Sequence, residues 1–82
     1  MGTVTVRFFA RYAELAGRET TEIAIPAATT VADVVRRVRD TVPGAAALPE
    51  RPLAALNLRQ ATPDAAVRDG DELALLPPLA GG

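Results

Sequence analysis

The chain has 82 residues, of which nine are basic and ten acidic, and its net charge at neutral pH is −1. That length holds one small domain with a single hydrophobic core. Neither cysteine nor histidine occurs, which excludes disulfides, thiolate metal sites and the common Ser–His and Cys–His catalytic pairs. The charge balance argues against nucleic acid as a partner, and no apolar run is long enough to cross a membrane. We therefore expect a cytoplasmic protein without a signal peptide, and without a metal or cofactor of its own.

The N-terminal segment 3–9 alternates between apolar and polar residues and is rich in β-branched side chains, so it predicts a strand. Its inward face is expected to carry Val4, Val6 and Phe8. That phase leaves Phe9 exposed at the end of the strand.

Residues 10–16 favour a short helix, because Gly17 stands where a left-handed residue ends a helix. Residues 19–25 predict a second strand, which Pro26 ends. The short connection between the two strands suggests an antiparallel pair.

The main helix begins after Thr30, which is a good N-cap, with Asp33 three residues on as in a capping box. Pro43-Gly44 ends it. One helical face carries five valines, Val31, Val34, Val35, Val38 and Val42. The charged residues between them, which we expect to be solvated, are Arg36, Arg37, Arg39 and Asp40.

The second half of the chain predicts a loop at 43–52, whose conformation the sequence does not define, and a third strand at 53–58. Residues 61–67 contain a turn and a short edge strand. Residues 68–72 reverse the chain into a last strand at 73–76.

The side chains of the later strands follow from their alternation. Leu56 is expected to lie inside on the third strand. On the last strand Leu73 and Leu75 face the helix, whereas Leu76 faces outward.

Two strands, a crossover helix and further strands predict an α+β fold, a mixed sheet with one main helix packed on one face. The crossover places the first and last strands side by side and parallel in the centre. This is the β-grasp roll of ubiquitin-like domains.

We divide the chain into a domain at 1–76 and an extended, flexible tail at 77–82. Proline cannot donate to a sheet ladder, and consecutive prolines favour an extended path. The residues expected to thread into a partner are Pro77, Pro78, Leu79, Ala80 and Gly81. Side chains shrink along this segment, so the carboxyl group of Gly82 would be unhindered and is the candidate reactive group.

Two motifs resemble those of one family. Residues 8–17, FFARYAELAG, resemble the opening of the small subunit of molybdopterin synthase, and residues 69–82, DGDELALLPPLAGG, resemble its ending. The helix start at 30–33 also fits. The resemblance spans the chain and includes the related ThiS/MoaD-like sulfur carriers.

The resemblance implies a sulfur carrier that is not catalytic alone. A ubiquitin-activating-type adenylyltransferase would use ATP to adenylate Gly82, and a sulfurtransferase would supply the sulfur that gives a thiocarboxylate. The tail would then enter the large subunit of molybdopterin synthase and donate sulfur for the molybdopterin dithiolene, in molybdenum cofactor biosynthesis.

A partner-binding patch beside the tail is expected from three outward apolar residues, Phe9, Leu58 and Leu76. Other functions share the activation chemistry up to the acyl-adenylate. They are sulfur carriage for thiamine, tRNA or amino-acid thiolation, and a ubiquitin-like modifier joined to lysines of target proteins. The acidic run at 69–71 is expected to be a turn rather than a cation loop, because it lacks the ligand spacing of one.

Overall fold

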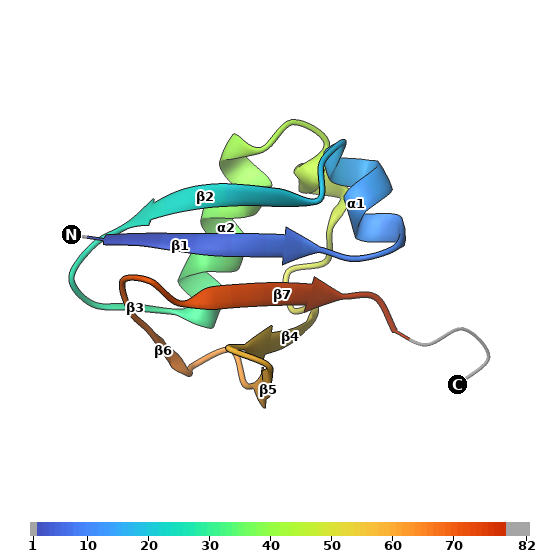
Figure 1. Cartoon of the computed structure of the whole chain (residues 1–82). Helices are drawn as coiled ribbons and strands as arrows, with labels where there is room; N and C mark the ends of the chain where they lie inside the picture. Colours follow the sequence, from blue (N-terminus) through green and yellow to red (C-terminus); the bar gives the residue numbers. More distant parts are fainter. Residues whose placement is uncertain (1, 79–82) are drawn as a thin grey trace.

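A computed structural model describes residues 2–78 of the chain. A five-stranded mixed sheet has the main helix, α2 (Val31–Thr41), across one face, and a short helix, α1 (Arg11–Ala16), at one end (Figure 1). The sheet has the strand order β2-β1-β7-β4-β5. The strands and the 3₁₀ helix are β1 (Gly2–Phe8), β2 (Thr20–Ile25), β3 (Thr29–Thr30), η1 (Ala45–Ala47), β4 (Leu53–Leu56), β5 (Arg59–Ala61), β6 (Ala66–Val67) and β7 (Glu72–Leu76).

The first and last strands lie side by side and parallel, as predicted. β1 pairs with β7 in the register Val6 to Leu73, and it pairs antiparallel with β2. β7 also pairs antiparallel with β4, so it lies between β1 and β4 at the centre of the sheet (Figure 1). The predicted β-grasp topology is confirmed.

The core lies between the sheet and α2. Val4 and Val6 are fully buried and Phe8 is nearly so, which confirms the predicted phase of β1. They face the valine side of α2, where Val34 and Val38 are also fully buried. Burial of one such side chain stabilises the fold by about 1.5–3 kcal/mol, so packing offsets the weak helix propensity of valine.

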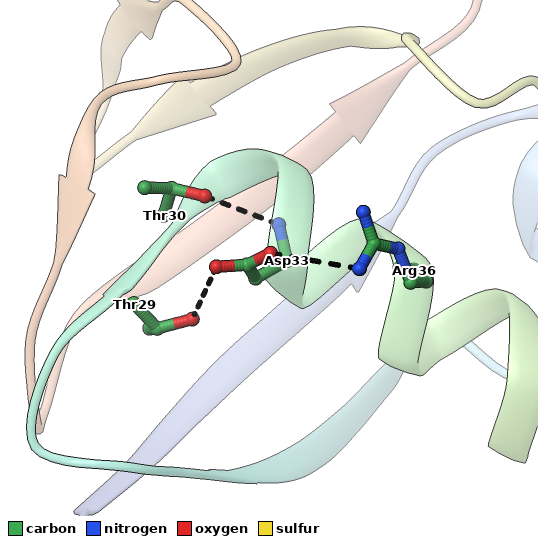
Figure 2. Close-up of polar contacts among 4 residues, drawn as sticks. All are labelled: Thr29, Thr30, Asp33 and Arg36. Carbon is green, nitrogen blue, oxygen red and sulfur yellow. Dashed lines mark hydrogen bonds and ion pairs between the residues drawn. The ribbon is translucent and has the colours of Figure 1, made fainter.

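The start of α2 has the predicted cap (Figure 2). The hydroxyl of Thr30 accepts a hydrogen bond from the backbone N–H of Asp33 at 3.3 Å. The Asp33 carboxylate accepts a hydrogen bond from the Thr29 hydroxyl at 3.4 Å and lies 4.0 Å from the guanidinium of Arg36. The helix ends at Thr41, with Val42 as its C-cap immediately before Pro43, as the sequence indicates.

A short strand is present within 61–67, but it is not an edge strand of the main sheet. This strand, β6, pairs with β3, the two residues before α2, whereas the edge strands of the main sheet are β2 and β5. Backbone bonds from Val31 and Ala32 to the carbonyl groups of Ala65 and Pro63 continue this contact. A two-residue ladder has too short a pattern to be recognised from alternation.

The segment 43–52 contains η1 and contributes to the core. Ala45 and Leu48 are buried there. Arg39, expected to be solvated, instead donates from Nε to the carbonyl oxygen of Leu48 at 2.9 Å and from Nη2 to that of Ala46 at 3.4 Å. Its position on α2 beside this loop explains the difference, because the loop offers carbonyl acceptors within reach.

The third strand is shorter than predicted. β4 ends at Leu56, and the next two residues, Asn57 and Leu58, form a turn with φ values of 52° and 71°. Leu56 is half-buried and packs against the core, as expected. Within residues 2–78, no helix is both long enough and apolar enough to cross a membrane.

Candidate functional site

A hollow of about 950 Å³ opens where β7 ends, between α1 and η1. Its lining is mainly apolar and includes Phe9, Leu15 and Leu76. Pro77 and Pro78, which follow β7 directly, line it as well. The chain leaves the sheet at the end of β7 (Figure 1). The hollow therefore lies at the base of the predicted tail.

A strained residue shapes one rim of the hollow. Ala10 has φ 49° and ψ −122°, a conformation that residues with a side chain rarely adopt. It turns the chain from β1 into α1, and the Tyr12 N–H then bonds to the Phe9 carbonyl at 3.0 Å. As a result Tyr12 is buried, whereas Phe9 is exposed at the rim, as its place after β1 predicts.

The opposite wall depends on a glycine. Gly44 has φ 85°, and a Cβ atom there would overlap the carbonyl oxygen of Leu15 on α1. Glycine thus lets η1 pack directly against α1. The Arg39 guanidinium donates hydrogen bonds to the carbonyl oxygens of Ala46 and Leu48, within and just after η1. Its Nη1 also lies 3.7 Å from a Glu50 carboxylate oxygen.

The outward face of the sheet adjoins the hollow through Phe9. The Arg7 guanidinium lies 5.3 Å from the centroid of the Phe9 ring, within the range of a cation–π contact. Arg7 Nη1 also lies 3.8 Å from a carboxylate oxygen of Glu72 on the neighbouring β7. Leu53 on β4 pairs with Leu76 and is 49% exposed.

Leu53 is a surface residue that the sequence analysis did not single out. The alternation of β4 carries the signal, since Leu53 stands out of phase with the inward residues Ala54 and Leu56. With Phe9 and Leu76 it extends the apolar surface from the hollow onto the sheet.

The predicted patch of Phe9, Leu58 and Leu76 is divided by the structure. Phe9 and Leu76 line the same hollow. Leu58 is 86% exposed, but it lies in the turn after Leu56, which pairs with Leu73 at the other end of β7. The positive φ values of the turn end the strand early and separate Leu58 from the other two. Whether these residues bind a partner stays a prediction.

The acidic run at 69–71 forms a turn, as expected. One carboxylate oxygen of Asp71 accepts from the Asn57 side chain at 2.9 Å and the other from the Arg68 N–H at 2.8 Å. These bonds, the Asn57 one foremost, hold the pKa of Asp71 below its ordinary value. Within the described residues, no group of three or more His, Cys, Asp or Glu side chains is arranged to hold a metal ion.

The predicted tail falls mostly beyond the structure. Pro77 is half-buried and Pro78 is exposed, and neither belongs to a strand. The reactive group predicted at Gly82, with Leu79, Ala80 and Gly81, lies outside the described residues. The division at residue 76 stays a prediction, although β7 does end at Leu76.

The sheet order, the parallel central pair and the single main helix define a ubiquitin-like β-grasp domain. The sequence profile of the ThiS family matches residues 6–82, and the chain belongs to this family. Its fold is that of the ThiS/MoaD-like, ubiquitin-like sulfur carriers, which confirms the resemblance seen in the two end motifs.

Several solved structures are similar over nearly the whole chain. SAMP1, the small archaeal modifier protein 1 of Haloferax volcanii, is 29% identical with a TM-score of 0.86, and the match covers 99% of this chain and 100% of that one. A putative molybdopterin converting factor subunit 1 from Pyrococcus furiosus is 26% identical, with a TM-score of 0.82 and coverage of 96% and 100%.

A third similar structure is a complex. It is the protein–protein complex of subunits 1 and 2 of the molybdopterin-converting factor from Helicobacter pylori 26695. The matching chain is 26% identical with a TM-score of 0.66, and the match covers 98% of this chain and 99% of that one.

Proposed function

We propose that this protein is the sulfur-carrying small subunit of a molybdopterin synthase. The carboxylate of Gly82 attacks the α-phosphorus of ATP in an adenylating enzyme, and pyrophosphate leaves. A sulfurtransferase supplies sulfur at the oxidation level of sulfide, which attacks the acyl carbon and expels AMP, so that a thiocarboxylate forms at Gly82. The thiocarboxylate sulfur then bonds to the pterin precursor of the dithiolene, and water cleaves the acyl–sulfur bond and restores the Gly82 carboxylate.

The observation that carries the proposal is the family match through residue 82, which includes the Gly81-Gly82 pair. A segment without Cβ atoms can enter a narrow channel toward an enclosed ATP site. The position of the C-terminal tail also favours a role as sulfur carrier. Pro77-Pro78 directly follows the central strand β7, which anchors the base of the tail in the sheet. Prolines there reduce the entropy lost when the tail is threaded.

In this proposal the chain is not an enzyme by itself, binds no cofactor and works in the cytoplasm. Its partners are the large synthase subunit, an adenylyltransferase of the ubiquitin-activating type and a sulfurtransferase. A large-subunit partner is supported by the similar Helicobacter pylori chain, which was solved in complex with subunit 2.

A second candidate is a protein modifier that is joined through the same carboxylate to lysines of other proteins. The similarity to a small archaeal modifier protein, with a TM-score of 0.86, favours it. Both candidates begin with the acyl-adenylate, so they diverge only in what attacks the activated carbonyl.

Mass spectrometry of the protein purified from its own host tests the chemistry. We expect a fraction in which one oxygen of the Gly82 carboxylate is replaced by sulfur. Recovery of Gly82 in isopeptide linkage to lysines of other proteins, with no thiocarboxylate, would favour the modifier instead.

Complementation tests the pathway. The chain should restore molybdoenzyme activity to a strain that lacks its molybdopterin synthase small subunit, and should leave a strain without its thiamine sulfur carrier auxotrophic. Deletion of Gly82 should abolish rescue while the urea unfolding curve stays unchanged. Rescue by the deletion variant would refute the role of the terminal carboxylate.

A further inference from the structure

We infer that the open edge of β2 is a binding site for an extended segment of another protein, which joins the five-stranded sheet as an added strand. The residue of that segment opposite Glu22 is basic, an arginine or a lysine. This site is separate from the carrier role proposed above, because it uses neither the tail nor the Gly82 carboxylate.

The backbone of β2 has one side paired and one side free. β2 is an edge of the sheet (Figure 1), and its register with β1 is continuous, without a bulge. The Phe8 N–H bonds to the Glu19 carbonyl at 2.8 Å, and hydrogen-bonded pairs alternate along an antiparallel ladder. The N–H and C=O groups of Thr20, Glu22 and Ala24 therefore point away from β1, toward the open edge.

These groups have no partner within residues 2–78. No hydrogen bond outside the sheet ladders reaches the backbone of Thr20, Glu22 or Ala24, and all three residues are exposed. Open edges attract other strands, so proteins usually shorten, bend or cover them, or place lysine or proline on them. The opposite edge, β5, has only three residues, whereas β2 has six and Glu22 is its only charge. An extended segment can add to such an edge through main-chain bonds.

Glu22 defines the chemistry of that segment. Its cross-strand neighbour on β1 is the uncharged Thr5, and within the described chain it takes part in no ion pair. Side chains directly opposite each other in an antiparallel pair interact, favourably for opposite charges and unfavourably for like charges. A basic side chain in the added strand therefore complements Glu22.

The same carboxylate argues against a second copy of this chain on the edge. Two β2 strands related by a two-fold axis use all three outward residues only when Glu22 lies opposite Glu22 of the second copy. That register places two carboxylates directly opposite each other, which destabilises the pair. The occupant is therefore a segment of a different protein.

Two synthetic peptides test the edge on the full chain. One is acetyl-Thr-Ile-Arg-Ile-Thr-amide, and the other has glutamate in place of the arginine. Proton–nitrogen NMR spectra of the isotope-labelled chain follow each titration. The arginine peptide should shift the amides of Thr20, Glu22 and Ala24 most, with a dissociation constant of about 1 mM, because one short ladder must first offset the entropy cost of association. The glutamate peptide should bind about fivefold more weakly.

Charge reversal on the protein provides the matched test. Glu22→Arg should invert the preference and bind the glutamate peptide about fivefold more tightly than the arginine peptide. Glu14→Arg makes the same change in net charge at an exposed residue of α1, so it should keep the wild-type preference. Ala24→Pro removes an outward N–H that the ladder with β1 does not use, and it should weaken binding of both peptides. Urea unfolding curves check that each variant retains the fold.

Each outcome decides the inference. An absence of amide shifts along β2 with both peptides would overturn the binding site. Equal affinity for the two peptides, or an unchanged preference in Glu22→Arg, would overturn the basic occupant. Shifts of the β2 amides on dilution of the peptide-free chain would make a second copy the occupant, which also overturns the inference. The carrier role would stand in all of these cases, because it is tested separately by the thiocarboxylate at Gly82.

Discussion

Replacement of Gly44 by alanine should destabilise the protein far more than the same change at Gly70. The two glycines have nearly the same backbone, with φ values of 85° and 86°. They differ in their surroundings, since a Cβ at Gly44 would overlap the Leu15 carbonyl oxygen, whereas nothing lies within 4 Å of a Cβ at Gly70. The pair therefore separates the cost of the conformation from the cost of the overlap.

The expected magnitudes follow from these two terms. A left-handed alanine costs about 1–2 kcal/mol, and this is the whole effect expected for Gly70→Ala. Forced displacement of packed backbone adds about 1–3 kcal/mol, so Gly44→Ala should cost about 2–5 kcal/mol. For a chain of this size a urea m-value near 1 kcal/mol per M turns these into midpoint shifts of about 1–2 M and about 2–5 M.

Urea unfolding followed by far-ultraviolet circular dichroism measures both variants. Equal losses at Gly44 and Gly70 would refute the reasoning, because η1 would then not depend on close contact with α1.

Two further predictions concern strain and pH. Ala10→Gly should stabilise the fold by about 0.5–2 kcal/mol in urea unfolding, because relief of about 1–3 kcal/mol of strain exceeds the entropy that glycine adds to the unfolded chain; a loss of stability would contradict the strained conformation. The lowered pKa of Asp71 means that its carboxylate contributes stability above its unfolded pKa of about 3.9, and that this contribution disappears as the pH falls through the lower folded value. Asp71→Asn should therefore be less stable at pH 7 and should lose less stability on acidification; parallel losses in the two proteins would contradict this.

Much of the fold was predictable because its signals are local. Val4, Val6 and Phe8 repeat every second residue, and the valines of α2 repeat with the helical period, so their burial followed from spacing alone. The Thr30 cap lies within one turn of the Asp33 N–H that donates to it, so it could also be predicted from the sequence.

The errors arose where distant backbone decides the conformation. The pairing of β3 with β6 involves residues far apart in the chain, and nothing in a two-residue segment indicates its partner. In the sequence Arg39 resembles a solvated charge on a helix, because the carbonyl group of Leu48 that it binds comes close only in the folded chain. Leu58 continues the apolar run of β4 in sequence, but it adopts a positive φ that its residue type does not suggest.

The candidate site was predictable only in part. Phe9 and Leu76 followed from strand phase, and the structure brings them together. The hollow itself did not follow, because its walls depend on Ala10 and Gly44, whose roles appear only when α1 and η1 touch.

The central place of β7 has a consequence for biosynthesis. Until residues 72–76 have been made, β1 and β4 each lack the neighbour that joins them, and both present open hydrogen-bonding edges. Contacts between the two extremes of a sequence form slowly, and here they complete the sheet. A nascent or prematurely terminated product that lacks β7 therefore cannot form the complete sheet, so the fold is completed only when the C-terminal end of the domain has been made.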